Sequence, residues 1–159
     1  MKLSKATILL KAVLVFSAIA LGLVVFSGVP GYMQHVVHER PDLAGWDYPM
    51  RGYGLLLALP VWAVMVLLWQ VFDTIPKNAP FCTENAQRFH KVSRLAEIDL
   101  GLVLVLGTFL VINGVTPAFI MGSLMLATFA GIVAAVVFHV LAGLVRNAAE
   151  LKQDSDMTI

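Results

Sequence analysis

The chain has 159 residues, of which 59% are hydrophobic and only 13% are charged. Soluble domains carry about 25% charged residues, so this composition excludes an ordinary soluble enzyme domain, a disordered chain and a nucleic-acid-coating protein. The net charge of +1 supplies no field that would recruit a polyanion, and the single cysteine, Cys82, excludes an intrachain disulfide.

Four apolar runs are each long enough to cross a bilayer, which requires about 20 mostly apolar residues. They cover about residues 8–29, 53–72, 95–115 and 118–145. None alternates with the period of two that is typical of a membrane strand, so we expect helices. The sequence therefore predicts an all-α fold, an integral membrane four-helix bundle that forms a single domain over residues 1–159.

The distribution of lysine and arginine predicts the orientation of these spans. Nine of the eleven basic residues flank the outer ends of the first and last runs or lie between the second and third. Because basic residues favour the cytoplasmic side, we expect both termini and the middle loop to be cytoplasmic in a multi-pass protein of the cell membrane. The nine are Lys2, Lys5, Lys11, Lys77, Arg88, Lys91, Arg94, Arg146 and Lys152.

The segment between the first two runs, residues 30–52, is rich in proline and glycine, so we expect a loop with a short helical piece. It contains His35, His38 and Glu39, which would share one face of a helix as conceivable zinc ligands. No HExxH motif and no fourth ligand accompany them. We therefore expect exposed or structural histidines, and neither a metal nor a cofactor.

The segment between the second and third runs predicts a cytoplasmic amphipathic helix. Two prolines within residues 73–80 end the second span, and Thr83 fits a helix N-cap. The helix covers about residues 83–95 and continues into the third span, with Arg88, Lys91 and Arg94 on its polar faces. Such a helix lies on anionic lipid or, in the alternative interpretation, docks a cytoplasmic partner.

Polar residues inside the spans gather in the cytoplasmic half. Lys11, Gln70, Asp99 and His139 come from four different helices. A charge inside a span is costly and is by default a functional hypothesis, so we predict an intramembrane polar cluster in which Lys11 can pair with Asp99. The residues alone do not distinguish structural glue, a proton-sensitive switch and a ligand site.

Small residues recur at every fourth position of the fourth run and predict a face for close helix packing. His139 lies in the same row, so we expect it to face protein rather than lipid. The row serves either an intramolecular seam or a homodimer interface. It consists of Ser123, Ala127, Gly131, Ala135 and Gly143.

Two segments carry a family resemblance. Residues 78–89, NAPFCTENAQRF, are similar to a proline–phenylalanine and ENxxR signature, and the tail from Ala149 to Ile159 is similar to an EL-x-x-E-x-D-L-T-I/V ending. Together they resemble a bacterial membrane family catalogued as domain of unknown function 2975. The departures are mild and comprise Cys82, Asp154 and Met157.

The resemblance implies four spans and no established activity. It also implies a partner, because members are often encoded beside small helix-turn-helix regulators. Both signatures fall in predicted cytoplasmic segments, so a transcription regulator is a candidate partner. The docking residues would be Arg88, Lys91 and Arg94 with the tail acids Glu150, Asp154 and Asp156, unless the acids pair with the basic helix in cis.

No catalytic constellation is present in the sequence: we find no Ser–His–acid spacing, phosphate loop or CxxC motif. We therefore expect a non-enzymatic regulatory or interaction protein that contacts the lipid bilayer and binds no nucleic acid directly. The sequence leaves open whether the chain forms homo-oligomers. The alternative is a small transporter or oligomeric channel that uses Asp99 and His139, and a metalloprotein based on His35 and His38 is the least favoured class.

Overall fold

A computed structural model describes residues 2–76, 81–114 and 118–157, and the regular structure within them is entirely helical. Short π and 3₁₀ segments, η1 and η2, interrupt the α-helices. The order is α1 (Lys2–Leu23), η1 (Val24–Gly28), α2 (Val29–Glu39), η2 (Pro41–Trp46), α3 (Asp47–Phe72), α4 (Thr83–Ile112) and α5 (Ala118–Met157).

The first helical rod is longer than the predicted span, because α1, η1 and α2 follow one another without a break from Lys2 to Glu39. The amide of Val29 donates to the carbonyl of Val24, an i→i+5 bond. Pro30 follows in the first turn of α2 and has no amide to donate. The wider π turn before it gives its ring room, so the helix continues past the proline.

The prediction of a loop with a short helical piece over residues 30–52 is therefore wrong. Helix α2, η2 and the start of α3 make this segment almost wholly helical. The chain reverses at Arg40, whose backbone (φ −131°, ψ 81°) is not helical. Pro41 explains this position, because a proline disfavours the helical conformation of the residue before it.

Helix α4 joins the segment 83–95 and the third apolar run in one 30-residue helix. Its N-cap is Cys82 rather than Thr83, because Cys82 has an extended backbone (φ −125°, ψ 154°) while Thr83 is already helical. Helix α5 is likewise longer than the fourth apolar run, since it continues to Met157 through most of the polar tail.

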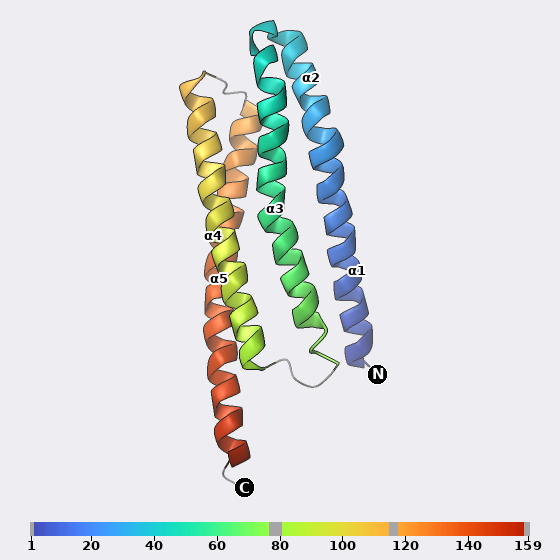
Figure 1. The fold of residues 1–159 in the computed structure, drawn as a ribbon, viewed down its shortest axis with the longest axis vertical. Helices are drawn as coiled ribbons and strands as arrows, with labels where there is room; N and C mark the ends of the chain where they lie inside the picture. The colour runs from blue at the N-terminus through green and yellow to red at the C-terminus, as the bar shows by residue number, and fades with distance from the viewer. Residues whose placement is uncertain (1, 77–80, 115–117, 158–159) are drawn as a thin grey trace.

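The helices pack in a row: α1 on α3, α3 on α4, and α4 most extensively on α5 (Figure 1). Both ends of the described chain and the α3–α4 connection lie at one end of the molecule, which we call the basic end (Figure 1). The opposite end, where α2 meets α3 through η2 and α4 approaches α5, is called the far end. Within the described residues, α1 packs closely on no long helix except α3.

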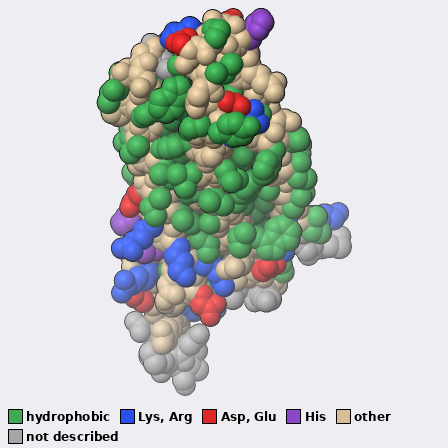
Figure 2. Space-filling view, turned by 45° about the horizontal axis from the view of Figure 1, so that its top comes forward, with side chains coloured by type: hydrophobic (Ala, Val, Ile, Leu, Met, Phe, Trp, Pro, Cys, Tyr) green, Lys and Arg blue, Asp and Glu red, His purple; other side chains and the backbone are tan. Residues whose placement is uncertain are grey.

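The surface between the two ends is apolar. Figure 2 shows hydrophobic side chains over the middle of one face, with charged side chains gathered toward its ends. Phe16, Met125 and Phe129 are among the large exposed apolar residues. Such a surface suits a bilayer rather than water. Helices long and apolar enough to cross a membrane lie within Lys5–Glu39, Pro41–Phe72, Thr83–Ile112 and Met121–Gln153, as in a multi-pass membrane protein.

The seam between α4 and α5 uses the middle of the predicted small-residue row. A Cβ added at Gly131 would lie 3.5 Å from Cδ1 of Leu100. The hydroxyl of Ser93 donates to the carbonyl of Ala135 over 3.0 Å. Both Ser93 and Ala135 are buried. The other members, Ser123, Ala127 and Gly143, are exposed.

Candidate functional site

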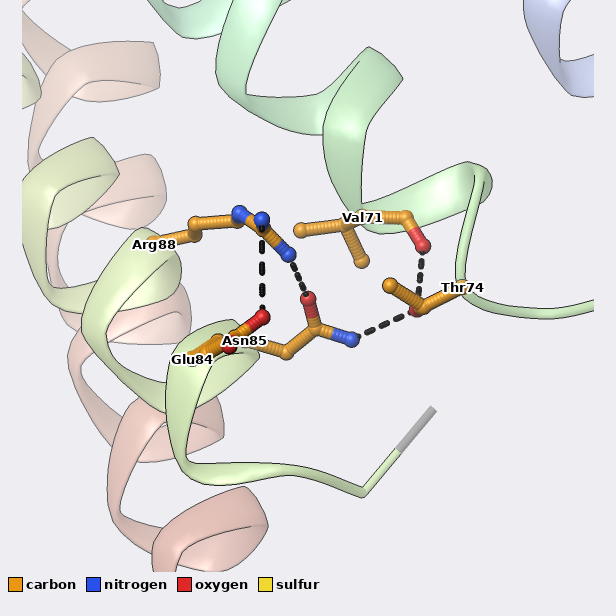
Figure 3. A network of polar contacts seen from close by, with 5 residues as sticks. All are labelled: Val71, Thr74, Glu84, Asn85 and Arg88. Carbon is orange, nitrogen blue, oxygen red and sulfur yellow. Dashed lines mark hydrogen bonds and ion pairs between the residues drawn. The ribbon is translucent and has the colours of Figure 1, made fainter. Parts of the chain in front are cut away.

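At the basic end, Asn85 connects the end of α3 to the start of α4 (Figure 3). Its side chain is fully buried. The amide nitrogen donates to Oγ1 of Thr74 over 2.7 Å, and the amide oxygen accepts from Arg88 over 2.7 Å. The Thr74 hydroxyl in turn donates to the carbonyl of Val71. We call these contacts, with the Arg88–Glu84 ion pair at 3.8 Å, the Asn85 network.

The network places part of the TENxxR sequence in a structural role. Arg88, expected on the docking surface, instead points its guanidinium at Asn85 and Glu84, and its side chain is only 23% exposed. A buried amide with partners on both sides fixes the geometry between two helices, because an unpaired buried polar group is costly. Residues 78–80 of the same signature lie outside the described residues.

Lys11 does not pair with Asp99. Its ammonium contacts the carboxylate of Asp73, directly after α3, and lies 4.7 Å from the ring centroid of Trp69. The reason is tertiary: α1 packs on α3, which keeps Lys11 beside the end of α3 and away from α4. Asp73 was not among the predicted polar residues.

The other members of the predicted polar cluster are also dispersed. Gln70 is exposed on α3. His139 of α5 faces His90 of α4, with ring centroids 6.2 Å apart. Asp99 lies nine residues beyond His90 on the same helix, or about 13 Å along its axis. Its buried Oδ1 has no hydrogen-bond partner in the described part of the chain, so Asp99 and His139 do not form one site.

A groove of about 940 Å³ lies between α4 and α5 at the basic end. We call it the basic groove, because most charged side chains lining it are cationic. Its polar lining consists of His90, Lys91, Arg94, His139, Arg146 and Glu150, together with Thr83, Gln87 and Gln153. The structure thus brings two predicted docking residues, Lys91 and Arg94, together with the predicted His139.

The charges in the basic groove are only partly paired. Arg146 donates to Glu150 over 2.9 Å within α5. Lys91 and Arg94 are exposed and form no ion pair with any described residue. Glu150 therefore pairs within its own helix rather than with the basic face of α4. The side chains of Asp154 and Asp156 lie outside the described ones.

Helix α5 extends past the start of α4 (Figure 1). Phe89 stacks on Phe138 at 6.0 Å and His90 faces His139, so the antiparallel register puts Thr83 near Val145. The remaining residues, 146–157, therefore project by about 18 Å. We call them the α5 extension, and they carry the charged tail beyond the apolar surface.

His35, His38 and Glu39 lie exposed in the last turns of α2, at the far end. His35 Nε2 lies 3.4 Å from the Glu39 carboxylate, one helical turn away. Within the described residues, no group of three or more histidine, cysteine, aspartate or glutamate side chains could hold a metal ion.

Sequence reasoning missed three polar residues of the basic end: Asp73, Thr74 and His90. Asp73 and Thr74 belong to the segment that ends the second span, where their polarity is expected of any loop. His90 lies on an amphipathic helix among other polar residues. Only the packing of α1, α3, α4 and α5 reveals their partners.

No match was found among curated proteins or among solved structures. Residues 31–159 match the family described as Protein of unknown function (DUF2975). The match includes the Asn85 network, the basic groove and the α5 extension, and it starts within α2. Because it covers most of the chain, this protein belongs to the DUF2975 family.

Proposed function

We propose that this membrane protein is a non-enzymatic regulator that docks a soluble cytoplasmic partner on the basic groove and the α5 extension. The observation that carries the proposal is the pair of exposed cations, Lys91 and Arg94, which lack ion pairs among the described residues and line a groove at the basic end. Unpaired surface charge supports steering and recognition of an oppositely charged partner.

The proposal includes an orientation. The basic end carries most lysines and arginines of the chain, and short segments rich in these residues stay in the cytoplasm. Both termini, the α3–α4 connection and the basic groove then face the cytoplasm, with the apolar runs crossing the cell membrane.

Two features support docking at this surface. The Asn85 network ties the start of α4 to the end of α3, so one wall of the groove is preorganised and a partner loses less entropy on binding. The α5 extension projects past the start of α4 (Figure 1), on the side that the proposed orientation assigns to the cytoplasm. The partner we expect presents acidic side chains to Lys91 and Arg94, and a helix-turn-helix regulator, suggested by the family resemblance, is the first candidate.

The test uses the full chain in cell membranes, co-expressed with a small helix-turn-helix regulator of the kind that the family resemblance suggests. A photo-crosslinking residue replaces Gln87, which is exposed and lines the groove. A second chain carries it at Tyr48, which is exposed at the far end. We expect a crosslink to the regulator from the groove position and none from Tyr48.

Charge reversal then tests the chemistry. The double variant Lys91→Glu/Arg94→Glu should lower the yield of the groove crosslink at least about tenfold, because two attractive contacts become repulsive. Lys5→Glu, an exposed lysine of α1 at the basic end that lines no part of the groove and lies outside the α5 extension, is the matched control and should retain it. Equal crosslinking in all variants would contradict recognition through Lys91 and Arg94. Crosslinks to lipid alone would contradict docking of a protein partner.

A transporter or oligomeric channel is the second candidate function, and one observation favours it. Asp99 holds a buried carboxylate oxygen without a hydrogen-bond partner in the described residues, and ionisable groups within spans often mark ion pathways. The separation of Asp99 from His139 argues against one ion pathway that uses both residues. We expect no proton or cation flux from proteoliposomes of the parent protein, and flux that disappears in Asp99→Asn would overturn this expectation.

A further inference from the structure

The far end contains a cavity of about 550 Å³ whose walls come from nearly every helix. Val24 and Val29 contribute from the first rod, Leu57 from α3, Leu106 and Leu110 from α4, and Ser123 from α5. The volume falls within the range of about 300–1,000 Å³ for ligand pockets, which are typically apolar with a few polar groups. We call it the far-end cavity.

The packing explains why this space is not filled. Helix α2 and helix α4 both line the cavity, yet α2 packs on α3 and not directly on α4 within the described residues. The π turn η1 forms part of one wall, and π turns occur frequently at functional sites. Glycines reduce the filling further: a Cβ added at Gly28 would meet only Val24, at 3.8 Å.

The lining is almost entirely hydrocarbon and aromatic. Trp46 and Phe109 meet edge to face at one wall, with ring centroids 4.9 Å apart. Two polar side chains of the lining are already engaged with the backbone. The Tyr53 hydroxyl donates to the carbonyl of Leu102, and the Asn113 amide donates to that of Phe109. The walls thus offer dispersion contacts and little hydrogen bonding to a ligand.

We propose that the far-end cavity binds a single hydrocarbon chain supplied by the surrounding lipid. An apolar cavity favours an apolar ligand over water, because water there would lose its hydrogen bonds. The lining has no charged side chain, so a polar headgroup stays outside while the chain enters. This site lies at the opposite end from the basic groove, and it does not depend on partner docking.

The probe is palmitic acid with a diazirine near the end of its chain, added to the full protein in detergent and photolysed. We expect labelling that saturates near one probe per chain and falls on peptides 53–57 and 106–110. Unlabelled palmitic acid should compete, and octanoic acid should compete at least about tenfold less strongly, because it buries fewer methylene groups.

Two filling variants locate the site. Leu57→Phe and Gly28→Leu each place extra carbon atoms in the lining, and each should weaken the saturable labelling about tenfold. Leu59→Phe is the matched control on the same helix, because Leu59 is 53% exposed and does not line the cavity. Circular dichroism and gel filtration establish that each variant is folded.

The experiment on the parent protein can overturn the proposal without the variants. Labelling that rises in proportion to the probe, without saturation or competition, and that spreads over exposed residues such as Leu59, Val66 and Leu104 would show adsorption to the apolar surface only. Saturable labelling that both filling variants leave unchanged would place the site elsewhere.

Discussion

The two ends of the molecule differ in which parts of the chain their ion pairs join. At the basic end, polar contacts join different parts of the chain: Lys11 meets Asp73, and Asn85 meets Thr74. At the far end, each ion pair between described residues joins neighbours at most four positions apart. These local pairs are His35–Glu39, Arg40–Asp42 and Arg51–Asp47.

This difference shows where the fold specifies geometry and where it leaves room. A buried hydrogen-bonded group such as Asn85 permits one arrangement of the helices it joins, because any other leaves polar atoms unpaired. A local ion pair constrains only its own helix. The far end is held together mainly by apolar and aromatic packing, such as Trp46 on Phe109, and by one hydrogen bond from α3 to α4, from the Tyr53 hydroxyl to the carbonyl of Leu102. Packing of this kind leaves room for the far-end cavity.

The largest effect is expected from breaking the connection at the basic end. Asn85→Ala removes both hydrogen bonds of the amide and leaves Thr74 and Arg88 without that partner. We expect the free energy of unfolding to fall by about 2–4 kcal/mol, measured by denaturation in a mild detergent. Gln87→Ala, two residues away and exposed, should change it little. A loss below about 0.5 kcal/mol would mean that the two ends do not differ as described.

The α4–α5 seam, which runs between the two ends, is expected to be next in sensitivity. Gly131→Leu forces side-chain atoms against Leu100 and should cost about 1–3 kcal/mol of unfolding free energy. Gly131→Ala should be tolerated, since its Cβ would make ordinary contacts at 3.5 Å and beyond. Gly143→Leu is the control on the same helix, with open space around its Cβ position. Equal stability of the two leucine variants would contradict a close seam at Gly131.

A smaller effect is expected for the ion pair between α1 and the end of α3. A double-mutant cycle with Lys11→Met and Asp73→Asn should give a coupling energy of about 0.5–1 kcal/mol, because both side chains remain partly exposed to solvent. Raising the salt concentration to about 1 M should reduce this coupling. A coupling indistinguishable from zero at low salt would show that this ion pair does not contribute to the packing of α1 on α3.

The smallest effect is expected at the far end. Asp42→Asn breaks a fully exposed pair with Arg40, two residues away, and should leave the thermal midpoint unchanged within error. Since the pair joins no separate helices, its loss should also leave labelling of the far-end cavity intact. A clear drop in the midpoint would show that local pairs at this end contribute to the packing of η2.

Several features were predictable because they depend on short stretches of sequence. Four apolar runs of spanning length predict four long helices, and the amphipathic pattern over residues 83–95 predicts the start of α4. The ENxxR segment was recognised as a signature, although its pattern did not reveal that Asn85 is buried. The helical course of residues 30–52 was missed, because proline and glycine were taken to indicate a loop. Instead, a π turn continues the first helix past Pro30, and after the reversal at Arg40 the 3₁₀ segment η2 leads into α3.

The predicted polar cluster and docking surface depended on distant parts of the chain, and the structure brings only some of their residues together. Depth in the membrane placed Lys11, Gln70, Asp99 and His139 at one level, but depth does not specify which helices are neighbours. Arg88 was assigned to docking by its charge, whereas packing turns it toward Asn85. Lys91 and Arg94 do lie on a common groove with His139.

The sequence by itself determined that this protein is helical, apolar along its middle and polar at its ends, because hydropathy and helix propensity act over one or a few turns. Only the tertiary structure decided which side chains meet: Lys11 with Asp73, Asn85 with Thr74, and His90 with His139. The physical reason is that these contacts require the order and register in which α1, α3, α4 and α5 pack. That order is set by the fit of many side chains at once, including the glycine and alanine positions that let α5 approach α4.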